Sequence, residues 1–297
     1  MERKILYFIN PISGARKKSG LADTIIEKTS TQRIKFDISF TTADGEYPWL
    51  PDRILEEEIT DVVICGGDGS VNQVVRAMLG LEVNVGIIPC GSGNGLANAA
   101  KIPRQVTKAL NIIFKGKAEL IDSFFINEQF SCMLCGLGFD AQVAHDFAAQ
   151  PSRGLSTYIR ETLRNFFIAP TYPFDITIKG KTFSTDAFFI SIANSNQFGN
   201  NFTIAPKASL NDGLLDIIVV KKMSKARLLW AVLNQIRAGQ VKEEKIFSTD
   251  VVLYFQAADV LINNPSMAPL HIDGDPALTA KKFKIEILRD AFRLLMP

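Results

Sequence analysis

Three glycine-rich turns, each placed directly after a run of strand-forming apolar residues, constrain the fold of this chain more than any other feature. The turns are NPISG (residues 10–14), GGDGSVNQ (66–73) and GSGNG (91–95). The runs DVVICGG and VNVGIIP are almost entirely apolar, as in parallel strands that are buried on both faces. Helix-like segments lie between the runs, and GSVNQVVRAML places Val71, Val74, Val75 and Met78 on one face. Residues 1–118 are therefore predicted to form a doubly wound α/β domain.

Beyond residue 119 the pattern changes to short strand-like runs joined by polar turns. These runs are DSFFI, FSCMLCG, FDITIKG, AFFISIAN, LLDIIVVKK, VVLYFQ, DVLINN and FKIEIL. Such a succession predicts an antiparallel β-sandwich or barrel over residues 119–285, interrupted by helices at 154–168 and 225–239. Residues 286–297 are expected to return to the first domain. The predicted fold class is thus α/β plus all-β.

Composition sets the class of protein. The 297 residues are 47% hydrophobic and 22% charged, as in a folded globular protein with a filled core. A net charge of +2 is too small to suggest nucleic-acid binding by charge alone. The N-terminal stretch lacks the apolar segment of a signal peptide, and no apolar run reaches the roughly 20 residues that span a bilayer. We therefore expect a cytoplasmic protein.

The four cysteines are Cys65, Cys90, Cys132 and Cys135, and they suit a reducing compartment. Cys132 and Cys135 form a CxxC. The surrounding FSCMLC is predicted to be one strand, in which this spacing points the two side chains to opposite faces. Because the chain has no second CxxC, core cysteines are predicted rather than a metal or redox pair.

The glycine-rich turns have the composition of a phosphate-binding site. Parallel strands end at one edge of their sheet, where such folds bind ligands. Glycine allows close approach of the backbone, so main-chain N–H groups and helix N-termini can hold phosphate oxygens. No GxxxxGK[ST] segment is present, which excludes a P-loop. Each turn taken singly is also consistent with an ordinary tight connection.

Asp68 lies between two glycines at the end of a predicted strand. A carboxylate on the phosphate side is repelled by the ligand unless it holds Mg²⁺ or accepts a proton. The alternative is a helix N-cap, which is a common role for aspartate.

A series of segments in fixed order resembles the diacylglycerol kinase and sphingosine kinase superfamily of lipid kinases. The segments are NPISG, GGDGSVNQVV, PCGSGNGLA, CGLGFDAQVA, IAPKASLNDGLLDIIVV, HIDGD and LRDAFRLLMP, and they cover almost the whole chain. The resemblance implies an ATP-dependent, Mg²⁺-requiring kinase that phosphorylates a lipid hydroxyl, such as that of diacylglycerol or a sphingoid base. Residues 1–118 would form its nucleotide-binding catalytic domain and residues 119–285 its lipid-binding sandwich.

The resemblance also implies the residues that contact ATP and metal. Those expected at ATP are Asn10, Pro11, Ser13, Gly14, Thr41 or Thr42, Gly66, Gly67, Asp68, Gly69, Ser70, Asn72, Gln73, Gly91, Ser92 and Asn94. A structural Mg²⁺ is expected at the Asp212 carboxylate with main-chain oxygens of Ser209 and Leu214, since oxygen ligands suit that ion. The segment Asn211-Asp212-Gly213 also has the composition of a β-turn, and the two interpretations are compatible.

The DGE motif of the family, whose acid is assigned as general base, corresponds here to Asp273, Gly274 and Asp275. The resemblance makes Asp275 the expected proton acceptor, and Asp273 belongs to the same candidate catalytic group. Asp68 would be a metal or substrate ligand, or the base as in sphingosine kinases. The resemblance implies that Asp68 and Asp275 share a cleft that receives the terminal phosphate of ATP. A simple turn is the alternative for the DGD segment.

Three positions depart from the family pattern. Gly95 stands where bacterial diacylglycerol kinases have the acid of GTxND, Gln73 stands where Glu is usual after GGDGTxN, and Asp275 replaces the longer Glu of DGE. The GSGN spelling is closer to the sphingosine and ceramide kinase branch. These losses leave open a lipid- or nucleotide-binding homologue without catalysis. A separate alternative is a kinase for a soluble substrate, such as NAD kinase, which shares a GGDG turn and a related build of an α/β domain followed by a β-sandwich.

Basic residues near apolar ones are the candidates for membrane contact. Arg16, Lys17 and Lys18 lie in the first glycine-rich turn region, and Arg160 and Arg164 share a face of the helical segment 154–168. Each could add about 1 kcal/mol of attraction to an anionic surface. The alternative is an amphipathic helix packed on the sandwich with a solvated basic face. The expected partner is a lipid substrate, reached by peripheral contact with the inner face of the membrane, and a homodimer is left open.

Overall fold

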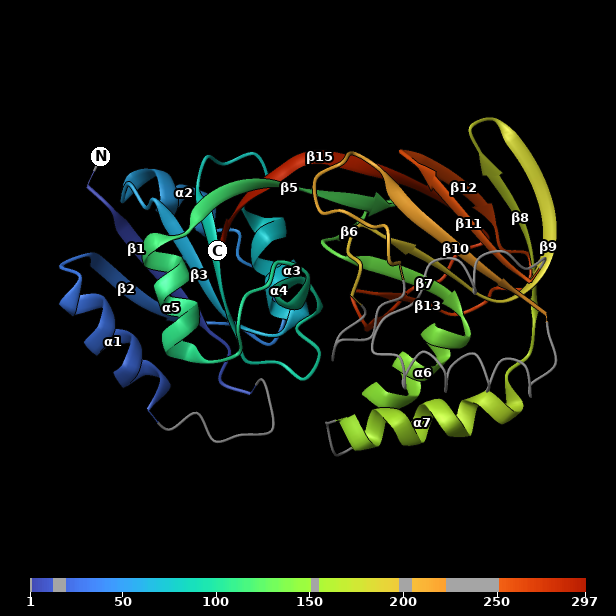
Figure 1. Ribbon diagram of the computed structural model, residues 1–297, viewed down its shortest axis with the longest axis horizontal. Coiled ribbons are helices and arrows are strands. Elements are labelled where there is room, and N and C mark those ends of the chain that lie inside the picture. The colour runs from blue at the N-terminus through green and yellow to red at the C-terminus, as the bar shows by residue number, and fades with distance from the viewer. Residues whose placement is uncertain (1, 13–19, 151–154, 198–204, 223–250) are drawn as a thin grey trace. The chain divides into compact units, whose positions relative to one another are not determined.

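The computed structural model of this chain describes residues 2–12, 20–150, 155–197, 205–222 and 251–297. The described chain divides into two compact units: unit 1 contains residues 1–122 and 290–297, and unit 2 contains residues 123–289. Strands β5 (Lys117–Ile126) and β15 (Lys282–Met296) each run from one unit into the other (Figure 1). None of the described helices is long and apolar enough to cross a membrane.

Unit 1 is built on a parallel sheet. Its strands are β1 (Lys4–Ile9), β2 (Lys35–Phe40), β3 (Asp61–Gly66) and β4 (Asn84–Pro89), in the spatial order β2-β1-β3-β4. The end of β15 adds a further parallel strand beside β4, with Leu294 opposite Val85. Every residue of β3 is buried, which accounts for its continuous apolar run.

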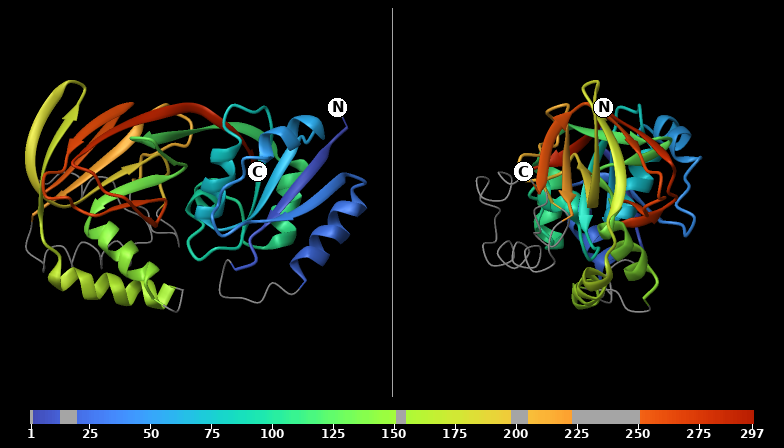
Figure 2. Two further views of the ribbon diagram at one scale, coloured as in Figure 1. Left: turned by 180° about the vertical axis from the view of Figure 1, so that it is seen from behind. Right: turned by 90° about the vertical axis from the view of Figure 1, so that its right-hand side faces the viewer.

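Five described helices belong to this unit, of which the first three connect β1 to β4 in turn and the last two follow β4. They are α1 (Leu21–Thr31), α2 (Leu50–Glu56), α3 (Asp68–Ala77), α4 (Gly95–Ala99) and α5 (Val106–Lys115). Val71, Val74, Val75 and Met78 are buried, as their spacing along α3 predicts. α1 and α5 contact each other (Figure 2). The strand order reverses between β1 and β3, and doubly wound folds bind ligands at the carboxyl ends of strands at such a reversal.

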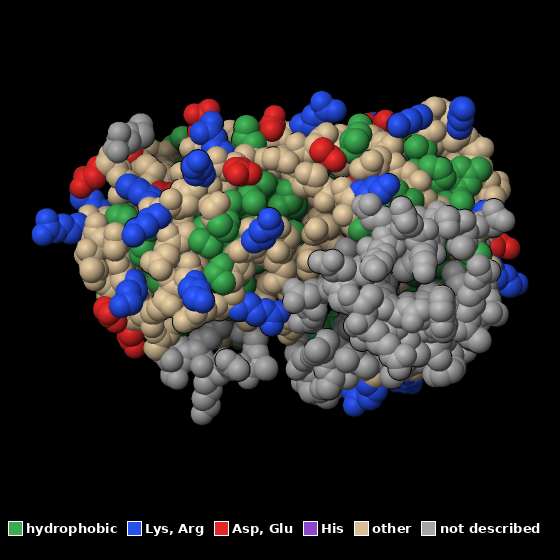
Figure 3. Space-filling model, in the orientation of Figure 1, with side chains coloured by type: hydrophobic (Ala, Val, Ile, Leu, Met, Phe, Trp, Pro, Cys, Tyr) green, Lys and Arg blue, Asp and Glu red, His purple; other side chains and the backbone are tan. Residues whose placement is uncertain are grey.

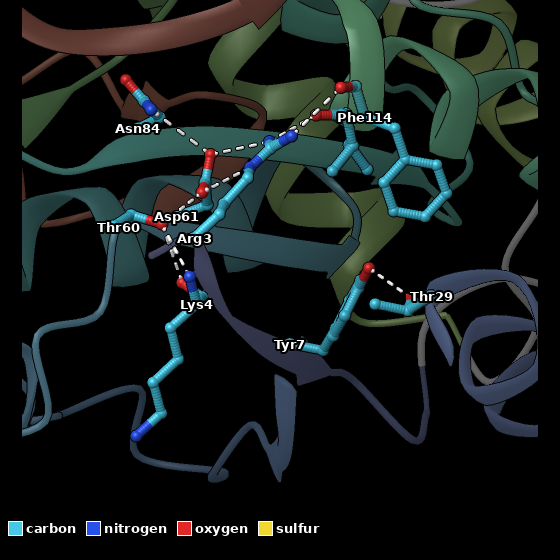
Figure 4. A network of polar contacts seen from close by, with 9 residues as sticks. Arg3, Lys4, Tyr7, Thr29, Thr60, Asp61, Asn84 and Phe114 are labelled. Atoms are coloured by element: carbon cyan, nitrogen blue, oxygen red, sulfur yellow. Dashed lines mark hydrogen bonds and ion pairs between the residues drawn. The ribbon is translucent and has the colours of Figure 1, made fainter. Parts of the chain in front are cut away.

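A partly buried ion pair links the amino ends of these strands, at the edge of the sheet opposite the glycine-rich turns. Arg3 donates to both carboxylate oxygens of Asp61 at 2.9 Å, and to two carbonyl oxygens at the end of α5 at 2.5 and 3.1 Å (Figure 4). Thr60 Oγ1 and Asn84 Nδ2 also donate to Asp61, at 2.6 and 3.3 Å. The Asp61 side chain is only 1% exposed, so its charge depends on these donors.

Replacing Arg3 by methionine is expected to lower the free energy of unfolding by about 3 kcal/mol, because Asp61 then keeps a buried charge without its main partner. This value is the lower end of the range for a broken buried pair, since the Arg3 side chain is 31% exposed. Urea denaturation measures the change. Adding Asp61→Asn to the variant should recover much of the loss, and a double variant no more stable than Arg3→Met would contradict this account.

Unit 2 is an antiparallel sheet that folds over an apolar core. Its strands beyond β5 and β15 are β6 (Gln129–Ser131), β7 (Leu134–Gly138), β8 (Tyr172–Ile178), β9 (Lys181–Ala193), β10 (Leu215–Lys221), β11 (Val252–Ala257), β12 (Asp259–Asn263), β13 (Leu270–Ile272) and β14 (Asp275–Ala277). The first half of β9 pairs with β8, and its second half lies between β7 and β10. Phe174, Ile190, Ile217 and Ile285 are among the residues that fill the core. The predicted fold class, α/β followed by a β-sandwich, is confirmed.

Two described helices belong to unit 2. α6 (Phe139–Ala148) follows β7 directly and contacts α7 (Leu155–Ile168) as well as β7, β13 and β14. α7 occupies the segment predicted to be helical at 154–168. The second helix predicted in this region, at 225–239, lies outside the described residues.

The run FSCMLCG does not form the single strand that its composition predicts. It is divided into β6 and β7, with a bend at residues 132 and 133. The N–H groups of Cys132 and Met133 donate to the carboxylate of Asp273 at 3.0 Å, which accounts for the bend. Cys132 and Cys135 are both buried free cysteines, and Cys135 lies in the core.

Candidate active site

Asn10 fastens the first glycine-rich turn to the end of β3. Its main-chain N–H donates to the Cys65 carbonyl at 3.0 Å, and its Nδ2 donates to Ser70 Oγ at 2.8 Å. Asn10 Oδ1 accepts the N–H of Ile12 at 3.0 Å, which shapes the turn itself. A Cβ at Gly66 would lie 2.6 Å from the Cβ of Ser70, so glycine is needed for Ser70 to reach Asn10. The first two turns are therefore joined by side chains that were predicted to bind ATP.

The second and third turns meet through glycine backbone. A Cβ at Gly91 would lie 2.5 Å from the Cα of Gly67 and 2.9 Å from Asn94 Oδ1. The Cys90 N–H donates to the Gly66 carbonyl at 2.8 Å, which continues the strand pairing into the turns. A side chain at either glycine would push the turns apart. These glycines thus allow the second and third turns to pack directly on each other.

Asn94 closes the third turn on itself. Its Oδ1 accepts the Gly91 N–H and its Nδ2 donates to the Gly91 carbonyl, both at 2.8 Å. Its φ of 55° is the left-handed conformation that asparagine tolerates well. Arg104 donates to the carbonyls of Ser92 and Gly93 at 3.0 and 3.1 Å. Because both ends of the Asn94 amide bond the loop, we expect its part in ATP binding to be indirect, through the shape of the turn.

Asp68 is the first residue of α3, and its Oδ1 accepts the N–H of Leu96 at 3.4 Å. The side chain therefore links the second turn to α4, which follows the third turn. The N-cap of α3 is Gly67, and no side-chain hydrogen bond caps this helix, so the N-cap alternative for Asp68 is wrong. Asp68 is only partly buried, which leaves its carboxylate accessible to a ligand. Its surroundings suit either a ligand of Mg²⁺ or an acceptor of a proton.

The loop that carries Thr41 and Thr42 follows β2 and is held against α3. The Thr41 N–H donates to the last carbonyl of β1 at 3.0 Å, and Thr42 is exposed. Gly45, with a φ of +68°, packs so closely on Gln73 that a Cβ there would overlap the side-chain amide. Gln73, where the family usually has Glu, thus contacts this loop as a neutral side chain.

The remaining ATP contacts predicted in unit 1 have different positions. Gly69, Asn72 and Ser92 are partly buried, Pro11 is exposed, and Ser13 and Gly14 lie outside the described residues. Gly95, which replaces the acid of the family pattern, begins α4 and is buried. The described part of the set, Thr41 and Thr42 included, gathers at the carboxyl ends of β1 to β4 and at the start of α3.

Asp273 and Gly274 form a two-residue hairpin turn between β13 and β14. Both have positive φ, 51° and 87°, as a type I′ turn requires. The buried Asp273 carboxylate accepts from the Ser131 hydroxyl at 2.7 Å and from the N–H groups of residues 132–134 at 3.0 Å. This use of its oxygens favours an anchoring role for Asp273 over the catalytic role considered from sequence. Asp275, the next acid, is exposed and begins β14.

The segment predicted to hold Mg²⁺ has oxygen atoms suited to that ion. Asp212 is exposed and its Oδ1 accepts the Leu214 N–H at 3.0 Å, while the Ser209 hydroxyl donates to Asn211 at 3.2 Å. Asp216 is buried, and its Oδ2 has no hydrogen-bond partner among the described residues. Burial raises the pKa of Asp216 to about 6, and the charge of Asp212 adds to the rise. A cation at Asp212 would relieve this excess of negative charge, so the residues fit the ion.

Carboxylate side chains alone would not complete such a site. The described residues contain no group of three or more His, Cys, Asp or Glu side chains arranged to hold a metal. Main-chain oxygens and water would have to supply the other ligands, as Mg²⁺ accepts.

Of the basic residues predicted to contact a membrane, only those on α7 lie among the described residues. The side chains of Arg160 and Arg164 are 63% and 70% exposed, and both approach the buried Glu161, at 3.3 and 3.7 Å. Arg16, Lys17 and Lys18 lie outside the described residues. On the face shown in Figure 3, the described Lys and Arg side chains are spread over the surface among Asp and Glu. Membrane contact through α7 stays a prediction.

His271 and Asp140 form a buried pair to which the sequence analysis gave no role. His271 is fully buried, and its Nε2 lies 3.4 Å from Asp140 Oδ2. The two residues are 131 positions apart, so no local spacing connects them. The one local signal is the glycine at position 136, which lies opposite His271 in the sheet and leaves room for both side chains.

Comparison with known proteins decides the family. Residues 4–126 match a model of the diacylglycerol kinase catalytic domain, and residues 134–296 match a model of the YegS C-terminal NAD kinase beta sandwich-like domain. The chain belongs to the family of diacylglycerol kinases and YegS-like lipid kinases. The resemblance carried by the sequence motifs is thereby confirmed, and membership of a kinase family implies ATP as the phosphoryl donor.

Individual members of the lipid kinase family match over most of the chain. A Pectobacterium atrosepticum protein named "Probable lipid kinase YegS-like" is 30% identical over 257 residues, which cover 82% of each chain. Bacillus subtilis diacylglycerol kinase is 26% identical over 281 residues, 92% of this chain and 89% of the relative. A solved structure from Bacillus anthracis, described as a diacylglycerol kinase, matches with a TM-score of 0.76 at 19% identity, covering 100% of this chain and 97% of that one. That likeness supports the fold.

Proposed function

We propose that this lipid kinase family member transfers the γ-phosphoryl group of ATP to the hydroxyl of a membrane lipid, with diacylglycerol and sphingoid bases as the candidate substrates. The observation that carries the proposal is the meeting of the glycine-rich turns at the carboxyl ends of β1, β3 and β4. Asn10, Ser70 and Gly91 join these turns, and Asp68 lies among them. A partly buried carboxylate beside turns of this kind suits phosphoryl transfer, which depends mainly on positioning and electrostatics.

We assign different roles in this reaction to the residues of the site. Main-chain N–H groups of the turns and the N-terminus of α3 would hold the phosphate oxygens of ATP. Asp275 would accept the proton of the lipid hydroxyl as its oxygen attacks the γ-phosphorus and the bond to ADP breaks. Asp68 would bind metal or orient the substrate, or would serve as the base in place of Asp275. Mg²⁺, when bound with ATP, supplies positive charge that offsets the negative charge of the phosphates.

The second role proposed for Mg²⁺ is structural and is tested at Asp212. Asp212→Ala should reduce the increase in melting temperature that Mg²⁺ gives the wild-type chain, since an ion that binds only the folded state stabilises it. Differential scanning fluorimetry over a range of Mg²⁺ concentrations measures this. Asp259→Ala, which removes an exposed carboxylate at the start of β12, is the matched control. An Asp212→Ala variant with the wild-type response would place the ion elsewhere.

A panel of substrates tests the proposed reaction directly. The chain is incubated with labelled ATP, Mg²⁺ and one of diacylglycerol, sphingosine, ceramide or NAD, and the product that carries phosphate is identified. Label in a lipid supports the proposal and names the substrate. Label in NAD alone would indicate a kinase for a soluble substrate. Saturable ATP binding with no labelled product would indicate a binding homologue that has lost catalysis.

A lipid substrate places the reaction at a membrane surface, and we propose that the contact is peripheral, at the inner face, with Arg160 and Arg164 of α7 taking part. Their exposure and positive charge support this. Lipid presented in anionic vesicles should therefore be phosphorylated faster than the same lipid in neutral vesicles. Equal rates on both would argue against an electrostatic contact.

A further inference from the structure

We infer that His271 is a positioning residue for Asp275, and that Asp140 holds it in the space left by Gly136. All four residues belong to unit 2. The inference rests on the proposed role of Asp275 as proton acceptor, and it adds the buried pair that sets the direction of that side chain.

Gly136 leaves the space in which His271 and Asp140 meet. Gly136 lies directly opposite His271 in the pairing of β7 with β13. The imidazole of His271 therefore occupies the space into which a side chain at position 136 would project. The chain then turns at Gly138, which has a φ of 97°, and enters α6, whose second residue is Asp140. A Cβ at Gly136 would overlap both Asp140 Oδ2 and His271 Nε2. The carboxylate and the imidazole therefore meet where any other residue would have its side chain.

The contacts of the imidazole define its tautomer. The main-chain N–H of Gly274 faces His271 Nδ1 at 3.3 Å, and because an amide N–H only donates, Nδ1 must accept. The proton of the neutral ring is then on Nε2, which faces Asp140 Oδ2 at 3.4 Å. Asp140 Oδ1 accepts the N–H of Ala141 at 2.9 Å, which fixes the carboxylate at the start of α6. One continuous set of contacts thus runs from α6 through His271 to Gly274.

The turn before Asp275 consequently has two anchors. The Asp273 carboxylate fastens it to residues 131–134, and His271 Nδ1 fastens its other residue, Gly274. Asp275 follows Gly274 directly and begins β14, so the direction of its side chain depends on the conformation of that turn. A proton acceptor must lie within hydrogen-bond reach of the hydroxyl, and misplacement by about 1 Å can cost about 100-fold in rate.

Two conservative variants separate the two contacts of His271. Asparagine places an amide oxygen near the position of Nδ1 and keeps an acceptor for the Gly274 N–H. Glutamine places an amide N–H near the position of Nε2 and keeps a donor for Asp140, but loses the acceptor. We expect His271→Gln to lower kcat about 10- to 100-fold with little change in KM for ATP or lipid, and His271→Asn to retain most of kcat. Equal losses in both variants, or a loss confined to KM, would overturn the inference.

A double variant connects the effect to Asp275. If His271 acts through that residue, adding His271→Gln to Asp275→Asn should lower kcat no further, because the group being positioned is already lost. A full additional loss would indicate a general structural effect. If the wild-type chain phosphorylates no lipid, or if Asp275→Asn is fully active, the proposed function itself fails. If Asp275→Asn is inactive while His271→Gln has wild-type kcat, only the inference about His271 fails.

Hydrogen exchange gives a readout that does not depend on activity. The peptide containing Gly274 should exchange its amide hydrogens faster in His271→Gln than in His271→Asn, since only the former loses the acceptor at Nδ1. Unchanged exchange in both would overturn the assignment of this contact. Gly136→Ala leaves both partners chemically unchanged but places a methyl group where they meet, so it should reproduce the faster exchange and the lower kcat.

Discussion

Asp275→Asn is expected to lower the turnover number for lipid phosphorylation by about 10² to 10⁴, the usual contribution of a general acid or base. Asparagine has nearly the shape of aspartate but cannot accept the proton. Asp275 is exposed at the start of a short strand, so the fold should be unaffected. Initial rates at saturating ATP and lipid measure the loss, and circular dichroism and ATP binding should match the wild type.

The family itself suggests the control for this experiment. Asp275→Glu restores the acid of the family's DGE motif and should retain substantial activity, because the carboxylate is kept and its reach increases by one methylene. An Asp275→Asn variant with wild-type turnover would remove this residue from the reaction. A loss of similar size in both variants would indicate that the position matters for shape and not for proton transfer.

Asp68→Asn is expected to lower turnover by a factor of the same order, about 10² to 10⁴. The amide oxygen can still accept the Leu96 N–H, so the contact between the start of α3 and α4 is preserved while the charge is removed. The dependence of rate on Mg²⁺ concentration separates the two roles of this side chain. If Asp68 binds metal, the Mg²⁺ concentration for half-maximal rate should rise. If Asp68 is the base, that concentration should stay unchanged while the rate falls.

Asp52→Asn is the matched control for Asp68. Asp52 is also an acid in the first turn of a helix of unit 1, and it is exposed. Asp52→Asn therefore shows the effect of losing a charge at a helix N-terminus by itself. We expect it to lower the free energy of unfolding by at most about 1 kcal/mol and to leave the turnover number unchanged. Equal effects of the two substitutions on rate would refute a specific role for Asp68.

Local sequence patterns predict a parallel α/β layout followed by antiparallel strands, and the family resemblance adds that these strands form a sandwich. The continuous apolar runs of β3 and β4 indicated parallel strands buried on both faces, and the spacing of Val71, Val74 and Val75 indicated the buried face of α3. These patterns depend only on residues that are close in sequence, so they can be recognised without knowing the tertiary contacts. The glycine-rich turns were likewise placed at strand ends, because parallel strands all end at one edge.

The finer structure of the site depends on contacts that no local pattern encodes. In the sequence, Asp273 is one of the two acids of the DGD motif. In the structure, its carboxylate accepts hydrogen bonds from the backbone of residues 132–134, some 140 positions earlier in the chain. The same contact bends the run FSCMLCG, which composition alone predicted as a single strand. The sequence also allows Asp68 to be a helix N-cap, and the position of Gly67 at the start of α3 excludes that role.

The route of the chain has a consequence for biosynthesis. The parallel sheet of unit 1 gains its strand beside β4 from residues near 293, which a ribosome makes only after all of unit 2. The buried side chains of Leu294 and Leu295 are therefore missing while unit 2 is being translated. During that interval the edge of β4 would be uncovered in residues 1–122 and could pair with strands of other chains. Nascent chains released before that last segment should aggregate or recruit chaperones, whereas chains that include it should not.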